Sequence, residues 1–528
     1  MTSAPRVAPI GATARNFRAV AAALDFDALR RDLGIAVEFP PDVSAQAESV
    51  AGEFASAAPD RTDIPFVTVD PPGARDLDQA LHIARHADGY LVSYAIADVA
   101  SYVAAGTPLD AETRRRGETL YFPDVRVPLH PAVLSEGAAS LLPGQVRAAV
   151  LWQITLDAAG LPTDVQLSRA RVRSTVQLDY AGLQAMLDAG TAPDAAALLP
   201  EVGRLRLGLE RQRHAINLDL PEQEVVPDDA GGWRLQWRAP LPVESWNAEI
   251  SLLTGMCAGD MMLRADIGLL RTLPAPDHGT VAHLARLAPA LDVTWPPGAQ
   301  PGDVLAGLDR ADPKHAAFLE HAASLLRGAG YTALDDTASV NTASVNTASV
   351  NTVSVNTASV NTVSVNTVSV NTASVNTASV NTADAAPGRF EHAGVGAVYA
   401  HVTAPLRRLV DRFATEVCLA LAAGTPVPDW ARTALPTLPD IMAASDHRAH
   451  ETDRAVVDMV EAWLLREQVG HEFDAVVLDA RPESAHIAVD DPPIRAGCDG
   501  HDLGEGSRIR VRLSTADVAA RQVRFAAV

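Results

Sequence analysis

The segment Val69–Leu81 has the sequence VDPPGARDLDQAL and carries three closely spaced carboxylates, Asp70, Asp76 and Asp78. The segment Phe66–Val69 predicts a short buried strand, which places Asp70 at its end. The two prolines and the glycine that follow predict a tight, irregular loop. Because residues two apart on extended backbone point to the same side, this loop can gather the three carboxylates around one small volume.

A loop of this kind suits metal binding. Crowded carboxylates repel one another, and a hard divalent cation relieves that repulsion. Mg²⁺ takes oxygen ligands, keeps several waters and is typically bound together with substrate phosphates. The three aspartates therefore indicate a phosphoryl-transfer site that uses Mg²⁺. The alternative from the loop alone is a solvated acidic surface, because most pairs of aspartates two residues apart take part in turns.

Further motifs follow the carboxylate loop in a fixed order. Ala80–Ala84 and Tyr90–Val99 predict a β-hairpin, and Pro108–Arg116 predicts a capped helix that a glycine ends. The sequence LYFPD follows at Leu120–Asp124. Much later in the chain, Tyr399–Asp411 reads YAHVTAPLRRLVD.

Together these motifs resemble the catalytic domain of the ribonuclease II family, the RNB domain. In that family a strand ends in D-x5-D-x-D-D-A, a hairpin ends in I-A-D-V, and a later segment reads Y-x-H-F-T-S-P-I-R-R-Y-x-D. The resemblance extends from about Ile64 to about Glu467. It implies an α+β multidomain fold, with an RNB catalytic domain of mixed sheet and helices at 61–467 and a small C-terminal OB/S1 β-barrel at 468–528. The residues before them, 1–60, predict a helical N-terminal region.

The resemblance also implies a function, which is processive hydrolysis of single-stranded RNA from the 3′ end to nucleoside 5′-monophosphates with two divalent ions. Asp78 and Arg407 would be catalytic, and Arg407 would contact the phosphate under attack. The metal ligands would be Asp70, Asp76, Asp78 and Gln79.

Further residues are implied in RNA binding and in support of the site. Glu249 and Asp453 would lie behind the metal ligands. The RNA contacts would be Tyr121, Tyr180, Arg407, Arg408, Phe473, Arg508, Arg510 and Arg512. For the aromatic residues the alternative is core packing, and for the last three arginines it is a solvated face. OB geometry favours RNA contact, because stacking tolerates any base.

Gln79 stands where the family has a fourth aspartate. A glutamine carbonyl can coordinate Mg²⁺ but brings no charge, so the second metal position should be weaker. Three outcomes stay open: a slower nuclease, a preference for Mn²⁺, or a catalytically inactive RNA-binding protein on the same fold. We expect activity, because Asp78, Arg407 and Tyr121 are present.

Two regions depart from the usual family plan. Residues 1–60 predict helices at Ala14–Leu24, Phe26–Leu33 and Ser44–Ala57, in place of cold-shock-like barrels. They would form a helix-turn-helix-like module or a packing extension. Residues 337–382 repeat Asn-Thr-(Ala/Val)-Ser-Val, and we expect a disordered insertion, with a square β-solenoid as the alternative.

The formal net charge of −22 is unusual for a protein that binds nucleic acid, because phosphate affinity normally comes from Lys and Arg. Lys314 is the single lysine, and arginine suits bidentate phosphate contact, so we expect arginines along an internal channel. The alternatives are an acidic protein without a nucleic-acid partner and a metal-dependent phosphoesterase of small substrates. Three scattered cysteines and the lack of a long apolar run predict a cytoplasmic protein without membrane contact, and we expect a monomer.

Overall fold

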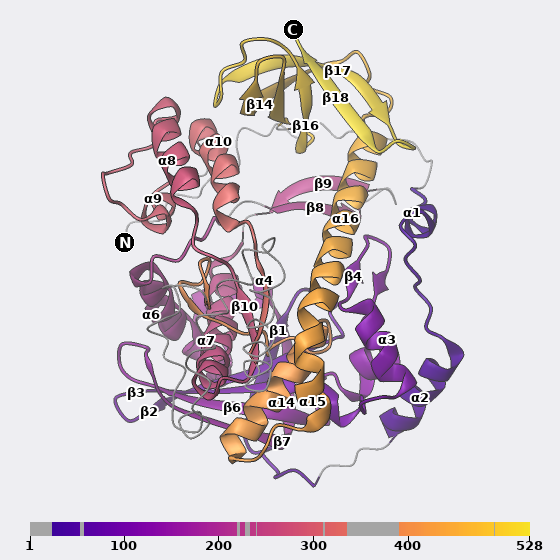
Figure 1. Cartoon of the computed structure of the whole chain (residues 1–528), viewed down its shortest axis with the longest axis vertical. Coiled ribbons are helices and arrows are strands. Elements are labelled where there is room, and N and C mark those ends of the chain that lie inside the picture. The colour runs from indigo at the N-terminus through magenta and orange to yellow at the C-terminus, as the bar shows by residue number, and fades with distance from the viewer. Residues whose placement is uncertain are drawn as a thin grey trace, which may run out of the picture.

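The computed structural model describes residues 24–52, 57–218, 222–227, 233–238, 240–309, 312–334, 390–489 and 491–528. The repeat at 337–382 and all but the last residue of the predicted helix Ala14–Leu24 lie outside the described residues. Figure 1 shows a small C-terminal barrel above a larger part of the chain, with the long helix α16 (Leu438–Leu465) running between them.

A closed five-stranded barrel forms the centre of this larger part. Strand β1 pairs with β2 in antiparallel and with β7 in parallel orientation, so that Asp70 at the end of β1 lies opposite Asp179 at the end of β7. Fully buried Trp152 and Tyr94 contribute to its core. The strands are β1 (Phe66–Asp70), β2 (Gln79–His86), β3 (Gly89–Ala97), β6 (Val146–Leu156) and β7 (Pro162–Asp179).

Helices pack against this barrel and extend its apolar core. Ile250 and Leu253 of α7 lie in one buried cluster with Val410 and Phe413 of α14. This packing holds the start of α14, which follows Arg407, against the barrel. The helices are α3 (Pro108–Arg116), α4 (Tyr180–Ala189), α5 (Asp194–Ala197), α6 (Leu199–Gln212), α7 (Pro242–Ala265), α14 (Leu409–Ala423) and α15 (Asp429–Ala434).

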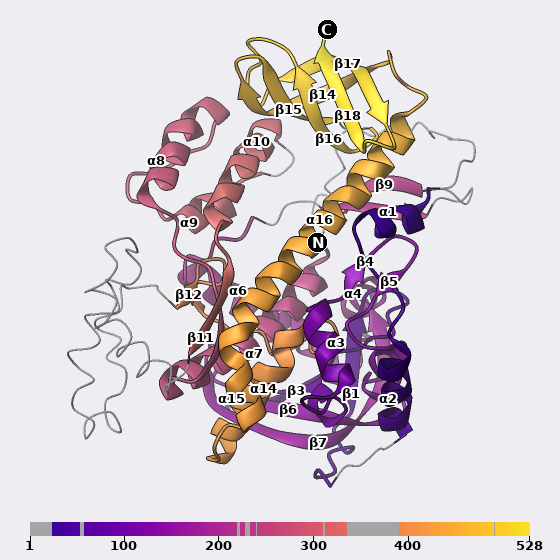
Figure 2. The ribbon, with the colours of Figure 1, turned by 45° about the vertical axis from the view of Figure 1, so that its right-hand side comes forward.

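A second closed five-stranded barrel ends the chain. Figure 2 shows α10 directly beside it, and Phe318 and Leu319 of α10 share a buried cluster with Val476 and Leu478 of the barrel. In the sequence, the segment that joins the paired strands β10 (Gly268–Thr272) and β11 (Gly330–Leu334) carries helices α8 (His278–Leu287), α9 (Pro301–Ala306) and α10 (Pro313–Ala322). The barrel strands are β14 (Glu472–Arg481), β15 (Ser484–Val489), β16 (Ile494–Asp499), β17 (Arg508–Asp517) and β18 (Gln522–Ala527).

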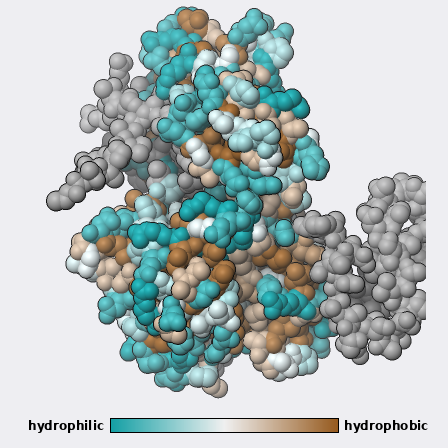
Figure 3. All heavy atoms as spheres, turned by 90° about the vertical axis from the view of Figure 1, so that its left-hand side faces the viewer, coloured by the Kyte–Doolittle hydropathy of each residue, from teal (hydrophilic) through white to brown (hydrophobic). Residues whose placement is uncertain are grey.

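Short elements complete the described chain. They are α1 (Phe26–Asp32), α2 (Pro41–Gly52), and the two-stranded pairs β4 (Leu120–Tyr121) with β5 (Arg126–Val127), β8 (Glu222–Pro227) with β9 (Trp233–Arg238), and β12 (Glu391–His392) with β13 (Ala397–Val398). Among the described residues, no helix is both long enough and apolar enough to cross a bilayer. Figure 3 shows one face, where hydrophilic residues cover much of the surface and hydrophobic residues lie between them in small groups.

Candidate active site

Hydrogen bonds between side chains and the loop backbone fix the loop that carries the three aspartates. The Ser140 hydroxyl donates to the Arg75 carbonyl at 2.6 Å and accepts from the Leu77 N–H at 3.0 Å. The side-chain amide of Gln177 donates to the Ala74 carbonyl at 2.7 Å. Because these contacts tie the loop to the barrel and to the segment before β6, the carboxylates are held in place before any ligand binds.

Asp78 is the most deeply placed of the three carboxylates, with 3% of its surface exposed. Its Oδ1 accepts a hydrogen bond from the Leu406 N–H at 2.7 Å, and its Oδ2 lies 3.8 Å from Nε of Arg407. Burial raises the pKa of Asp78 well above its usual range, although Arg407 opposes the shift. The carboxylate of Asp78 therefore requires more positive charge than Arg407 supplies if it is to stay ionised.

Asp70 also requires additional positive charge nearby to stay ionised. Its Oδ2 is buried and accepts no hydrogen bond. Burial, followed by repulsion from Asp76, raises the pKa of Asp70 to about 7, while Arg407 lowers it. A buried carboxylate oxygen without a donor fits a position for a cation, and this donor set of oxygens suits Mg²⁺ or Mn²⁺.

Asp76 forms an ion pair with Arg126 of β5. Among the residues that the structure describes, the three loop aspartates are not a group whose ligand atoms all lie within 4.8 Å of one another. A site for two ions about 4 Å apart needs ligands spread more widely than a site for one ion. Asp76 can act as one of these ligands only after its ion pair with Arg126 breaks. The metal assignment of the three aspartates stays a prediction.

Gln79 begins β2, and its side-chain N–H group donates a hydrogen bond to the carbonyl of Thr403. This contact links the carboxylate loop to the segment that carries Arg407. The amide of Gln79 thus has a structural partner, and its expected role as an uncharged metal ligand stays a prediction.

The arginine segment is positioned by Asp411 in the first turn of α14. Asp411 accepts a hydrogen bond from the Ala404 N–H at 2.6 Å and forms an ion pair with Arg408 at 2.9 Å. The Arg408 side chain is 15% exposed, whereas that of Arg407 is 45% exposed. Arg408 therefore shapes the turn, and Arg407 is the guanidinium that is free to meet a ligand.

Tyr121 lies beside Arg407 and is 47% exposed, so the alternative that it packs in the core is wrong. Both residues line a cavity of about 150 Å³ with Arg408, Glu118 and Asp453. Asp453, from α16, thus lies in the cavity beside Arg407, and its expected place behind the metal ligands stays a prediction. The cavity has an aromatic wall, a cation and carboxylates, which are the groups that can bind a nucleotide's base, phosphate and hydroxyls.

Tyr180 begins α4, one residue after Asp179. Burial raises the pKa of its hydroxyl, with a further contribution from the charge of Asp70, and a hydrogen bond joins it to the side chain of Asn247. Tyr180 therefore lies beside the carboxylates. Asn247 of α7 was not predicted, because an asparagine within an apolar helix carries no recognisable motif.

Glu249 occupies a different place from the one predicted. It lies 3.9 Å from Arg206 of α6, and burial followed by the charge of Glu210 raises its pKa to about 7. Positions two apart on a helix point to nearly opposite sides, so Asn247 faces Tyr180 while Glu249 faces α6. The expectation that Glu249 supports the metal ligands is therefore wrong. Glu249 instead contacts Arg206 between helices α7 and α6.

The C-terminal barrel also corrects one prediction. Phe473 is 8% exposed and packs edge-on against Phe525 at 5.6 Å in the barrel core, so it is not an exposed stacking ring. Alternation in β17 does place the side chains of Arg508, Arg510 and Arg512 on one exposed face. Arg510 pairs with Asp474 and Arg512 with Glu472, both at 2.9 Å, and the role of this face in RNA binding stays a prediction.

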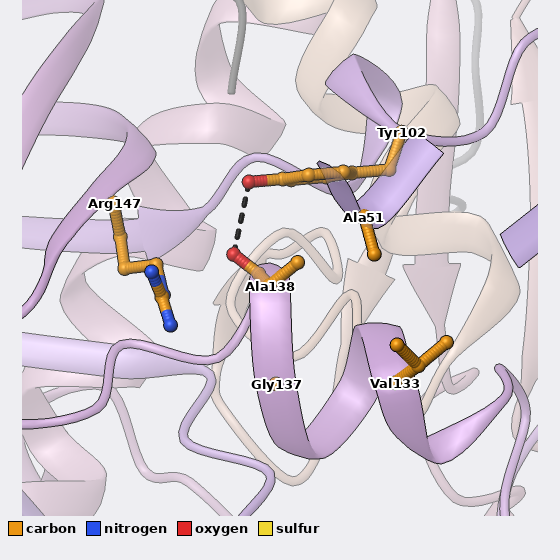
Figure 4. Close-up of a pocket in the computed structure, with 6 residues that line it drawn as sticks. All are labelled: Ala51, Tyr102, Val133, Gly137, Ala138 and Arg147. Carbon is orange, nitrogen blue, oxygen red and sulfur yellow. Dashed lines mark hydrogen bonds between the residues drawn. The ribbon is translucent and has the colours of Figure 1, made fainter. Parts of the chain in front are cut away.

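A separate cavity of about 310 Å³ shares no lining residue with the candidate site. Figure 4 shows that its lining is mostly small or apolar, with the Tyr102 hydroxyl donating to the Ala138 carbonyl at 2.9 Å and Arg147 at one side. The Arg147 guanidinium already donates to the carbonyl of Ser140 at 3.0 Å.

Comparison with known proteins decides the family. The model of the RNB domain matches residues 59–420, well over half of the 528 residues. The chain belongs to the RNB family. The model of the RNase II-type exonuclease C-terminal S1 domain matches residues 471–528. The predicted family and the α+β fold class with a C-terminal S1 barrel are therefore confirmed.

Individual relatives give the same family. Exoribonuclease 2 of Edwardsiella piscicida is 33% identical over 222 residues, which cover 40% of this chain and 34% of that protein. The chain thus aligns with about a third of this curated relative's length. Mycoplasma genitalium RNase R, also solved with ribose methylated single-stranded RNA, superposes with a TM-score of 0.77 and 18% identity over 96% of this chain and 78% of the other. Yeast Ssd1, a pseudonuclease, superposes with a TM-score of 0.63 and 15% identity over 93% of this chain and 58% of the other.

Proposed function

We propose that this protein is an exoribonuclease that processively hydrolyses single-stranded RNA from the 3′ end to nucleoside 5′-monophosphates with divalent metal ions. The observation that carries the proposal is the pair of carboxylates Asp70, whose Oδ2 is buried, and Asp78, on which the guanidinium of Arg407 acts from just before the start of α14. The two carboxylates and the partly exposed Arg407 together form a site that can bind divalent metal ions and a phosphate.

The aspartates, Arg407 and Asp411 have different roles in this proposed reaction. Asp70, Asp76 and Asp78 would hold the divalent ions, which would supply an activated water and stabilisation of the leaving oxygen of a phosphodiester. The Arg407 guanidinium binds the scissile phosphate with charge-assisted hydrogen bonds. Asp411, by holding the backbone of Ala404 and the side chain of Arg408, sets the direction of Arg407.

In this proposal, Tyr121 and Tyr180 bind the bases of the RNA. The exposed ring of Tyr121 can stack on a base near the 3′ end. Tyr180, at the start of α4, lies close to Asp70 at the end of β1. Stacking does not depend on base identity, so the enzyme can move along RNA of any sequence. Asp453, in the same cavity as Tyr121, can accept a hydrogen bond from a ribose hydroxyl.

A second candidate function is RNA binding without hydrolysis, and Gln79 favours it. The uncharged amide stands in the carboxylate cluster and donates to Thr403, and a pseudonuclease, Ssd1, shares the fold. We rank hydrolysis first, because Asp78 and Arg407 retain their contact.

The assay uses a single-stranded oligoribonucleotide labelled at the 5′ end in one sample and at the 3′ end in another, with Mg²⁺ or Mn²⁺. Attack from the 3′ end releases labelled mononucleotide from the 3′-labelled RNA at once and shortens the 5′-labelled RNA stepwise. Asp78→Asn is expected to abolish release while RNA binding persists. RNA binding without release in either metal would establish the second candidate instead.

A further inference from the structure

Three potential metal ligands meet at the junction between helix α10 and the C-terminal barrel, outside the candidate active site. They are His321 near the end of α10, Asp479 of β14, and Glu505 in the loop before β17. One ligand atom from each lies within 4.8 Å of the other two, and no other three such residues in the described part of the chain form a group of this kind.

The local geometry fits a small cation. Nε2 of His321 lies 3.3 Å from Oε2 of Glu505, yet this nitrogen is buried and makes no hydrogen bond. Zinc binds nitrogen and oxygen at about 2.0–2.2 Å, so two ligands of a tetrahedral site lie roughly 3.3–3.5 Å apart. The observed separation equals one edge of such a tetrahedron.

The backbone of β14 orients one of these ligands. The Ala480 N–H donates to Oε1 of Glu505 at 3.1 Å, which leaves Oε2 directed at His321. A ligand whose second oxygen is held in this way needs little reorganisation to bind a metal. The backbone also bulges between Val477 and Asp479, which sets the position of Asp479 on the strand.

The donor set selects the class of ion. Two carboxylates neutralise a divalent charge, and an imidazole nitrogen favours zinc and similar transition metals over Mg²⁺. The apolar contacts of Phe318 and Leu319 with the barrel already bring the two surfaces together, and Arg495 pairs with Glu320 at 3.0 Å next to His321. An ion here would add a coordinate link across the same junction.

We propose that His321, Asp479 and Glu505 bind one Zn²⁺ ion, or an ion of the same class, that fastens the C-terminal barrel to helix α10. The site is independent of the proposed RNA hydrolysis, since it shares no residue with the carboxylate loop.

The test is isothermal titration of Zn²⁺ into the full chain, without a polyhistidine tag and with excess Mg²⁺ present to occupy oxygen-only sites. The wild type is expected to bind one Zn²⁺ tightly, and His321→Ala should weaken that binding by at least about 100-fold. Glu505→Gln should weaken it as well. His283→Ala, which changes an exposed histidine of the neighbouring helix α8, should bind as the wild type does.

A second readout keeps the test independent of folding. Cobalt substituted for zinc gives visible absorption bands whose intensity reports tetrahedral coordination, and these bands should be lost in His321→Ala while the circular dichroism of the metal-free protein is unchanged. Zinc binding of equal strength in the wild type and in His321→Ala, or no zinc binding by the wild type, would overturn the proposal.

Discussion

The substitution Asp70→Asn removes a titratable carboxyl group, and the contribution of that group to the pH dependence of stability can be worked out from the structure. The pKa of Asp70 is about 7 in the folded chain against 3.8 for the free side chain, chiefly because of burial. As the pH rises from about 4 to about 7, the Asp70 carboxyl therefore loses its proton in the unfolded chain but keeps it in the folded chain. Stability that is fully present below pH about 4 is lost as the pH rises through about 7. At 1.36 kcal/mol per pKa unit, the metal-free protein is about 4 kcal/mol less stable at pH 8 through this group.

The measurement is urea unfolding with EDTA at pH 5 and pH 8. Between these values the wild type should lose roughly 2–3 kcal/mol more unfolding free energy than Asp70→Asn, because the amide does not titrate. Mg²⁺ at pH 8 should restore stability to the wild type and much less to the variant. Asp88→Asn, in the exposed turn between β2 and β3, is the control that should follow the wild type. Parallel pH dependence of the wild type and Asp70→Asn would refute the reasoning.

Three further substitutions give distinct outcomes. Arg407→Lys should lower kcat about 100-fold at unchanged melting temperature, because lysine cannot bind phosphate in a bidentate manner; unchanged kcat would place the phosphate elsewhere. Tyr121→Ala should weaken binding of short RNA by about 1–3 kcal/mol and lengthen the limit product, as gel analysis of digests would show. Gln79→Asp should raise the Mg²⁺-dependent rate while it destabilises the fold by about 1 kcal/mol, since the donor to Thr403 is lost; a lower rate would show that this position holds no ion.

Local signals predicted the elements that surround the carboxylate loop. The hairpin turn between β2 and β3 and the helix Pro108–Arg116 appear as expected, because glycine, proline and capping residues act over a few positions. Helix α16 begins at Leu438, directly before a proline. Prolines in the first turn of a helix are compatible with it, and Pro439 there does not break α16.

Side-chain direction in tertiary contacts was harder to predict. Glu249 and Phe473 were assigned from the family pattern, but the packing of α7 against α6 and the closure of the C-terminal barrel decide where each side chain points. Ser140 fixes the loop from more than sixty positions away, and nothing near it in sequence marks that role. The long strand β7 escaped detection because its exposed arginines and polar residues conceal a strand that pairs on both sides.

The most direct test of the central claim is a crystal structure of the full chain with Mn²⁺ and a non-hydrolysable single-stranded RNA, with manganese located by its anomalous scattering. The account predicts manganese bound by Asp70 and Asp78, with the phosphodiester nearest the 3′ end in contact with Arg407. Manganese absent from these carboxylates, or an RNA end bound away from Arg407, would contradict it.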